Sequence, residues 1–143
     1  MELKDISHNL TFSTVEKPGK TTNSDESIQS VGKERINSLK QLVGEIEFLI
    51  LERERLSKQI VDETEKIKTE IQNFLLSSEA VDSEDFKERN GLRNKQIDIS
   101  ELQLNEKVNC WRDVALLKKE LRERVKELNE KEERMAVFEK ILY

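Results

Sequence analysis

The chain contains one cysteine and one tryptophan, which are adjacent in the segment KVNCWRDVALL, residues 107–117. A cysteine nucleophile needs a nearby base or a helix N-terminus that lowers the pKa of its thiol. The only histidine, His8, lies in a stretch that we expect to be flexible, and Cys110 falls in the middle of an expected helix. The pair Cys110–Trp111 therefore favours a structural or interface role, with redox sensing by an exposed thiol as the alternative.

Metal and cofactor chemistry is not indicated either. One cysteine and one histidine cannot complete a zinc site unless carboxylates stand at matching positions. A di-iron helical bundle needs Glu-x-x-His pairs, and no histidine follows His8. Walker, Gly-x-Gly-x-x-Gly and Gly-x-Ser-x-Gly motifs do not occur. We therefore predict a protein that is not an enzyme, with no catalytic residue, no cofactor, no metal site and no small-molecule substrate.

A basic cluster near the C-terminal end is the remaining candidate for ligand chemistry. It consists of Lys118, Lys119, Arg122, Arg124 and Lys126, and it alternates with Glu120, Glu123 and Glu127. Phosphate binding needs positive charge that is not opposed by nearby carboxylates. With a net charge of −5 for the whole chain, a solvated mixed-charge face is favoured over direct nucleic-acid binding.

The composition indicates the elements that must carry these residues. Charged residues make up 38% of the chain, and there are only 4 glycines and 1 proline, which is typical of long helices and coiled coils. A chain this short with few large apolar residues cannot bury a deep core, but it can bury stripes against other helices. We predict an all-α fold of two long amphipathic helices, as a coiled coil or helical hairpin, after a disordered N-terminal tail.

The expected boundaries follow from breaks in the helical pattern. Residues 1–32 have no sustained period and should form a flexible polar tail. The first helix is expected over residues 33–78, a turn over 79–91 and the second helix over 92–143. Asp82 is the expected N-cap with Asp85 at N3, and Val81 and Phe86 are spaced for a hydrophobic staple. Asn90-Gly91 follows closely and is a candidate helix break.

Apolar residues at steps of three and four predict a helix–helix or partner seam on each helix. A second row beside the seam of the first helix consists of Leu42, Leu49 and Leu56. The seam itself is interrupted by Arg53, Ser57 and Thr64, and polar residues at such positions can fix register and partner number. The predicted partner interface consists of Ile36, Leu39, Val43, Ile46, Ile50, Ile60 and Ile67 on the first helix, and of Leu104, Val108, Trp111, Val114, Leu117, Leu121, Val125 and Leu128 on the second.

No membrane insertion is expected. The longest apolar run, Phe48–Leu51, is far shorter than the ~20 residues of a spanning helix. The first residues lack the apolar core of a signal peptide, and the last residues hold no cysteine for prenylation. A single cysteine cannot form an internal disulfide, so an intracellular, reducing compartment is expected.

The stretch Trp111–Leu128, WRDVALLKKELRERVKEL, resembles the coiled-coil half of centromere protein H, a helical subunit of the inner kinetochore. The shared features are a tryptophan, a Leu-Leu pair and alternating Arg, Lys and Glu with spaced leucines. The resemblance is confined to this stretch. It implies partners of the centromere protein I and K group, a scaffold role on centromeric chromatin and a place in the nucleus.

The leading hypothesis is therefore a non-catalytic subunit of a hetero-oligomeric helical assembly, most specifically one at the inner kinetochore during cell division. Two alternatives use the same helices differently. One is a cytoplasmic adaptor or tether in membrane traffic, and the other is a helical regulator that masks the groove of an enzyme. Other helical subunits are the expected partners in the leading hypothesis.

Overall fold

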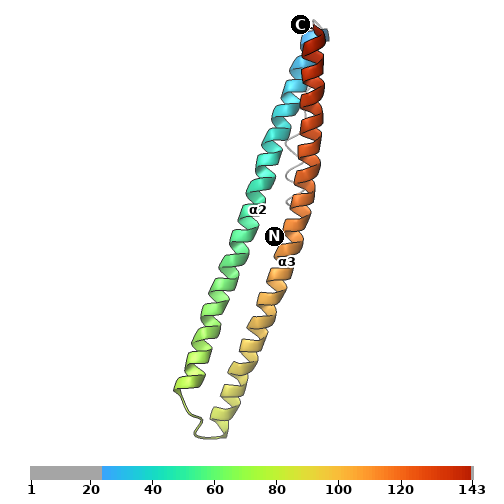
Figure 1. The fold of residues 1–143 in the computed structure, drawn as a ribbon. Helices are drawn as coiled ribbons and strands as arrows, with labels where there is room; N and C mark the ends of the chain where they lie inside the picture. Colours follow the sequence, from blue (N-terminus) through green and yellow to red (C-terminus); the bar gives the residue numbers. More distant parts are fainter. Residues whose placement is uncertain (1–23, 143) are drawn as a thin grey trace. The chain divides into compact units, whose positions relative to one another are not determined.

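The computed structural model describes residues 24–142, with side chains from Ser27 onward. These residues form helices α2 (Ser24–Ser77) and α3 (Ser83–Leu142), joined by a short loop (Figure 1). No strand occurs in this part of the chain, so the prediction of an all-α fold with two long helices is confirmed. Most of the expected tail, residues 1–23, and the final residue lie outside the described residues.

Helix α2 begins at Ser24 and not near Lys33, so the predicted tail boundary at residue 32 is wrong and residues 27–32 are helical. Gly32 does not stop the helix. A Cβ atom at Gly32 would collide with the end of the Met135 side chain from α3, so this side chain lies directly against the Gly32 backbone.

The start of α3 is fixed by reciprocal capping at Asp82 and Asp85. The Asp82 carboxylate accepts a hydrogen bond from the Asp85 N–H at 2.8 Å, and the Asp85 carboxylate accepts one from the Val81 N–H at 3.0 Å. The Asp82 carboxylate satisfies a donor of the first helical turn, and the Asp85 carboxylate binds the backbone just before the helix. The predicted cap is therefore confirmed, whereas Val81 and Phe86 are both largely exposed and bury little as a staple.

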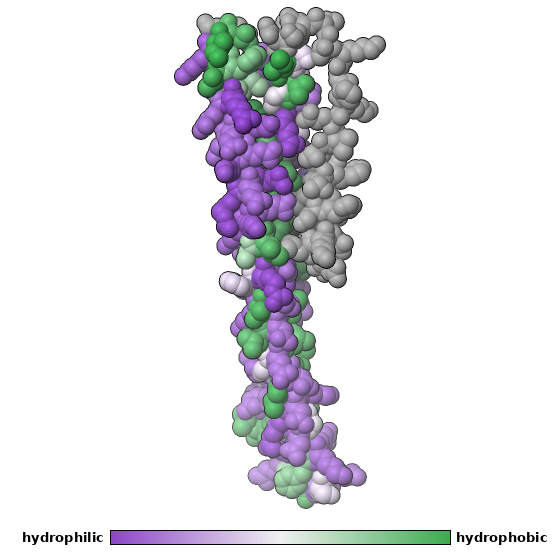
Figure 2. Space-filling view, turned by 90° about the vertical axis from the view of Figure 1, so that its right-hand side faces the viewer, coloured by the Kyte–Doolittle hydropathy of each residue, from purple (hydrophilic) through white to green (hydrophobic). Residues whose placement is uncertain are grey.

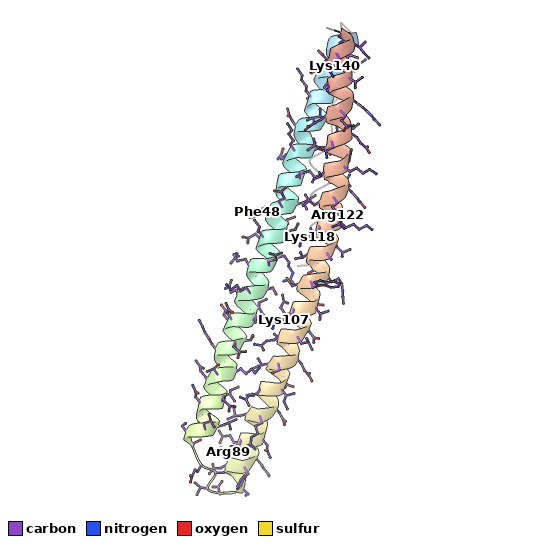
Figure 3. All side chains as sticks on the ribbon, viewed as in Figure 1. Phe48, Arg89, Lys107, Lys118, Arg122 and Lys140 are labelled. Carbon is purple, nitrogen blue, oxygen red and sulfur yellow. The ribbon has the colours of Figure 1, made fainter. Side chains whose placement is uncertain are left out.

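The predicted turn over residues 79–91 is too long, because α3 runs without interruption through Asn90 and Gly91. A helical glycine costs about 1 kcal/mol relative to alanine, which the capped first turn and the long following helix can offset. Arg89, labelled at the loop end in Figure 3, donates hydrogen bonds to the Leu75 carbonyl at 3.1 Å and the Ser78 hydroxyl at 3.0 Å. A cation at this position satisfies groups at the C-terminal end of α2.

The described chain divides into two compact units. The terminal unit comprises residues 24–50 and 115–142, and the loop unit comprises residues 51–114. The helices are antiparallel within each unit. Gly32 lies beside Met135 and Arg35 binds Glu127 in the terminal unit, whereas Arg53 binds Asp113 and Gln96 binds Gln72 in the loop unit.

Candidate partner-binding surfaces

An apolar stripe packs between the helices of the terminal unit. Leu39 and Leu117 are each 1% exposed and Ile46 is fully buried. Leu42, which the sequence placed on the flank of the seam, is buried as well. The predicted interface residues of this unit that are buried or half-buried are Ile36, Leu39, Val43, Ile46, Ile50, Leu117, Leu121, Val125 and Leu128. Most of the predicted stripe is therefore covered within the chain itself.

Ion pairs border this stripe. The Glu127 carboxylate accepts hydrogen bonds from Arg35 at 2.8 Å and from Arg124 at 3.0 Å, and Lys40 lies 3.8 Å from Glu132. Burial alone would raise the pKa of Glu127, but the two arginine hydrogen bonds and their charges outweigh it and hold the pKa below its ordinary value. Glu127 therefore stays ionised and links α2 to α3.

The helix–helix contact of the loop unit is polar by contrast. Arg53 donates hydrogen bonds to Glu106 at 2.6 Å and to Asp113 at 2.9 Å across the two helices. Burial would lower the pKa of Arg53, but these two carboxylates together raise it above its ordinary value. The Cys110 thiol lies at the same level, with Sγ 3.9 Å from the Arg53 carbonyl oxygen. A charged cluster thus occupies a position where a coiled coil usually has apolar residues.

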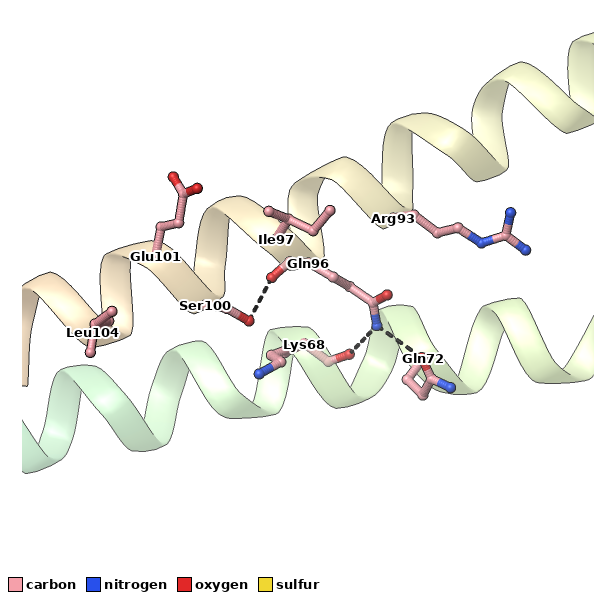
Figure 4. A pocket seen from close by; sticks show the side chains of 8 residues that line it. All are labelled: Lys68, Gln72, Arg93, Gln96, Ile97, Ser100, Glu101 and Leu104. Atoms are coloured by element: carbon pink, nitrogen blue, oxygen red, sulfur yellow. Dashed lines mark hydrogen bonds between the residues drawn. The ribbon is translucent and has the colours of Figure 1, made fainter.

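Amide side chains continue this polar contact toward the loop. The amide nitrogen of the buried Gln103 lies 3.1 Å from the Thr64 hydroxyl and 3.0 Å from the Glu65 carboxylate. Gln96 reaches across to the Lys68 carbonyl at 3.4 Å and to the Gln72 side chain at 3.0 Å, as Figure 4 shows. Arg53, Ser57 and Thr64 are each buried or half-buried on α2, so the prediction that polar residues interrupt the seam here is confirmed.

The polar partners on α3 were missed from the sequence. A usable signal existed, because residues at similar distances from the loop face one another in an antiparallel helix pair. Arg53 and the acidic residues Glu106 and Asp113 meet this condition, and so do Thr64 and Gln103. Searching for complementary polar residues placed in this way would have indicated the contact.

Two rows of large apolar side chains are exposed on the loop unit. The α2 row consists of Leu56, Ile60, Ile67 and Phe74, and the α3 row consists of Ile97, Leu104, Val108 and Trp111. Trp111 is 75% exposed and Leu104 is 62% exposed. The space-filling view shows apolar side chains among the hydrophilic ones toward the loop end (Figure 2). Ile60, Ile67, Leu104, Val108 and Trp111 therefore do not continue the internal stripe, and their role as a partner interface stays a prediction.

The error in register has a geometric cause. A straight α-helix turns about 20° away from a strict seven-residue repeat in every heptad. Ile60, Ile67 and Phe74 keep that repeat, so they rotate off the contact face of α2. On α3, Val114 is buried at the contact face. The next contact residue toward the loop is Cys110, four residues before Val114, whereas Trp111, three residues before it, lies outside the contact.

Cys110 and Trp111 consequently lie on different faces of α3. The half-buried thiol points at the backbone of α2, where its neighbours are a carbonyl group and the Arg53 ion pairs. Cys110 stands in the middle of α3 and not at a helix N-terminus, and the charged groups near it in residues 24–142 are paired with one another. The part of the chain from residue 24 to residue 142 also shows no group of three side chains able to hold a metal ion.

The basic cluster separates into two parts. Arg124 lies against Glu120 and Glu127, whereas Lys118, Lys119, Arg122 and Lys126 are exposed and make no ion pair with any described residue. Figure 3 labels Lys118 and Arg122 on α3. The exposed Glu123 lies among these cations on the same helix. The prediction that this face is solvated and does not bind nucleic acid stays a prediction.

Neither α2 nor α3 contains a stretch apolar enough to cross a membrane. No family model, curated protein or solved structure matches the chain.

Proposed function

We propose that the chain is a non-catalytic structural subunit of a multi-protein helical assembly, and that the loop unit carries its partner contacts. The observation that supports this most directly is the exposed α3 row. Leu104, Val108 and Trp111 stand at steps of four and three residues and are all exposed. That spacing is the one by which a second helix is bound in a coiled coil. Exposed apolar rows of this kind mark sites of protein–protein contact, and tryptophan is enriched among the residues that dominate such contacts.

The polar contact between α2 and α3 supports the same proposal. If α2 and α3 were rotated about their axes, the two apolar rows could pack against each other within the chain. The ion pairs of Arg53 and the hydrogen bonds of Gln103 instead hold the polar faces of the two helices together and leave the apolar rows exposed. Such polar contacts fix register at a cost in stability. The apolar surface is thereby kept available for other subunits.

The cellular process follows from the resemblance of Trp111–Leu128 to centromere protein H. We propose the inner kinetochore as the assembly and the nucleus as the location, with helical subunits of the centromere protein I and K type as partners. A traffic tether and a regulator of an enzyme would use the same exposed rows. Identification of the partners separates these three assignments.

The experiment is affinity purification of the tagged full chain from its native cells, followed by identification of the co-purifying proteins. We expect helical inner-kinetochore subunits to co-purify with the natural chain and to be lost with Trp111→Ser. Phe48→Ser is the matched control, because Phe48 is an exposed aromatic residue of the terminal unit outside both rows. Vesicle-coat proteins or one stoichiometric enzyme would overturn the kinetochore assignment. Retention of all partners by Trp111→Ser would overturn the role of the α3 row.

A further inference from the structure

The α3 row borders an open groove of the loop unit. The groove has a volume of about 550 Å³, and it is lined by Lys68 and Gln72 from α2 and by Ile97, Ser100 and Leu104 from α3, among others. Figure 4 shows Gln96 reaching from α3 to Lys68 and Gln72 of α2, with Ile97 and Leu104 also on α3. Ile97 and Trp111 are fourteen residues apart, which corresponds to about 21 Å along a helix. The row and the groove together therefore form a binding surface about two heptads long, which suits one additional helix.

The charges beside the α3 row are mainly positive. Arg93 precedes Ile97 by four residues, Lys107 precedes Trp111 by four, and Arg112 follows Val108 by four. Residues four apart are neighbours on a helix surface. All three cations are exposed, and none forms an ion pair with another described residue. Glu101 is the single acidic residue at the same spacing.

The α2 row has the opposite charge beside it. Glu52, Glu63 and Glu70 stand three or four residues from members of that row. The two rows therefore suit different partners, since residues flanking a helix–helix seam select partners of complementary charge.

We propose that the α3 row binds a partner helix that has an apolar seam and acidic flanking residues, so that α2, α3 and the partner form a three-helix contact over the loop unit. This inference rests on the proposed function and names the chemistry of one partner. A second copy of the chain could offer its acidic α2 row to the α3 row. Such a contact can form reciprocally in a closed two-fold dimer or head to tail in an open series of copies. Sedimentation distinguishes both from a distinct partner helix, with which the chain alone stays monomeric.

The test uses the full chain and two designed peptides of about four heptads. Both peptides have leucine and isoleucine at the seam and lack tryptophan. One carries glutamate at the flanking positions and the other carries lysine, so like charges oppose self-association of each peptide. Trp111 is the only tryptophan of the chain, and a blue shift of its fluorescence reports that the α3 row has been covered.

We expect the glutamate peptide to bind at least about tenfold more tightly than the lysine peptide and to shift the Trp111 emission to the blue. The double variant Lys107→Glu, Arg112→Glu should reverse this preference. The matched control is Lys118→Glu, Arg122→Glu, which makes the same charge change at exposed positions of the terminal unit. Circular dichroism checks that each variant keeps its helix content.

Three results would overturn the proposal: equal binding of the two peptides, no binding of either, or binding without a shift of the Trp111 emission. Concentration-dependent burial of Trp111 with self-association of the chain in sedimentation, as a dimer or as larger species, would assign the row to a second copy and overturn the proposal as well. The proposed function fails by a different result. If the peptide preference is absent but partner subunits are purified in a Trp111-dependent manner, only the acidic-helix inference is wrong.

Discussion

The terminal unit and the loop unit use the same two helices in opposite ways. In the terminal unit, Leu39, Ile46 and Leu117 are buried between the helices, and charged residues border them. In the loop unit, Arg53, Gln103 and their partners occupy the contact, while Ile67, Leu104 and Trp111 are exposed. Burial of apolar surface is the main favourable term in folding, so the terminal unit should supply most of the stability of the chain.

This difference shows how one pair of helices can separate stability from binding. Polar contacts between helices contribute little net free energy, but they disfavour shifted registers, because a shift would leave buried charges unpaired. The loop unit thus keeps a defined arrangement without covering its apolar rows. A partner can then bury those rows.

The largest expected effect is a difference in the free energy of unfolding between two variants, each of which truncates one apolar residue in one of the two units. Leu39→Ala should lower the free energy of unfolding by about 2–5 kcal/mol, because Leu39 is almost fully buried and its truncation leaves a cavity. Trp111→Ala should change it by less than about 0.5 kcal/mol in the isolated chain, because Trp111 is exposed. Urea unfolding followed by circular dichroism measures both. Equal losses for the two variants would contradict the contrast between the units.

A smaller effect is expected from the charged cluster of the loop unit. Arg53→Leu should destabilise the chain by about 1–3 kcal/mol, since it leaves Glu106 and Asp113 half-buried without their partner. Adding Glu106→Leu and Asp113→Leu should recover most of the loss, because no unpaired charge then remains.

The control for this variant is Arg55→Leu, which removes an exposed arginine whose partners among the described residues, Glu52 and Gln59, both belong to its own helix. We expect no resolvable change of the urea midpoint, because solvent screens an exposed ion pair of this kind. If Arg53→Leu behaves like the control, the polar contact does not hold the helices together.

The smallest effect concerns pH and the terminal unit. Folding lowers the pKa of Glu127 from its ordinary value of 4.5, so the folded state binds this proton less readily than the unfolded state. The stabilisation is therefore complete above about pH 4.5 and is lost as pH falls through the lower pKa of the folded state.

Glu127→Gln should be less stable than the natural chain near neutral pH, by less than about 1 kcal/mol, and this difference should shrink at acidic pH. Urea midpoints measured from pH 7 to pH 3 test it, with the exposed Glu130→Gln as the control. A difference that does not depend on pH would show that Glu127 acts through packing only.

Sequence reasoning was most successful where a single physical rule decides the structure. Apolar residues at steps of three and four predicted two helices and the stripe from Ile36 to Ile50, because that spacing places side chains on one face. Asp82 and Asp85 were identified as a cap, since short polar side chains satisfy the first N–H groups of a helix. These rules operate within one helix and need no knowledge of its neighbour.

The loop unit could not be predicted in the same way. Its contact face depends on how much α2 and α3 turn along their length, and a shift of one residue exchanges Cys110 for Trp111 at the contact. Apolar residues alone suggested the wrong face, because the contact residues Arg53, Gln103 and Glu106 are polar. Only the pairing of residues across the two helices decides between the alternatives.

The capped loop also has a consequence for the order of folding. Contacts of Arg89 with Ser78 close a separation of only 11 residues, whereas the Arg35–Glu127 pair closes one of 92. Because the entropy of loop closure grows with the logarithm of loop length, the second contact costs about 2 kcal/mol more if it forms first. We therefore expect the helix pair to nucleate at the loop and to lengthen toward the termini. The polar contacts of the loop unit would then align the two helices before the apolar stripe of the terminal unit forms. The loop unit contributes least to the final stability, but it would set the register in which the terminal unit packs.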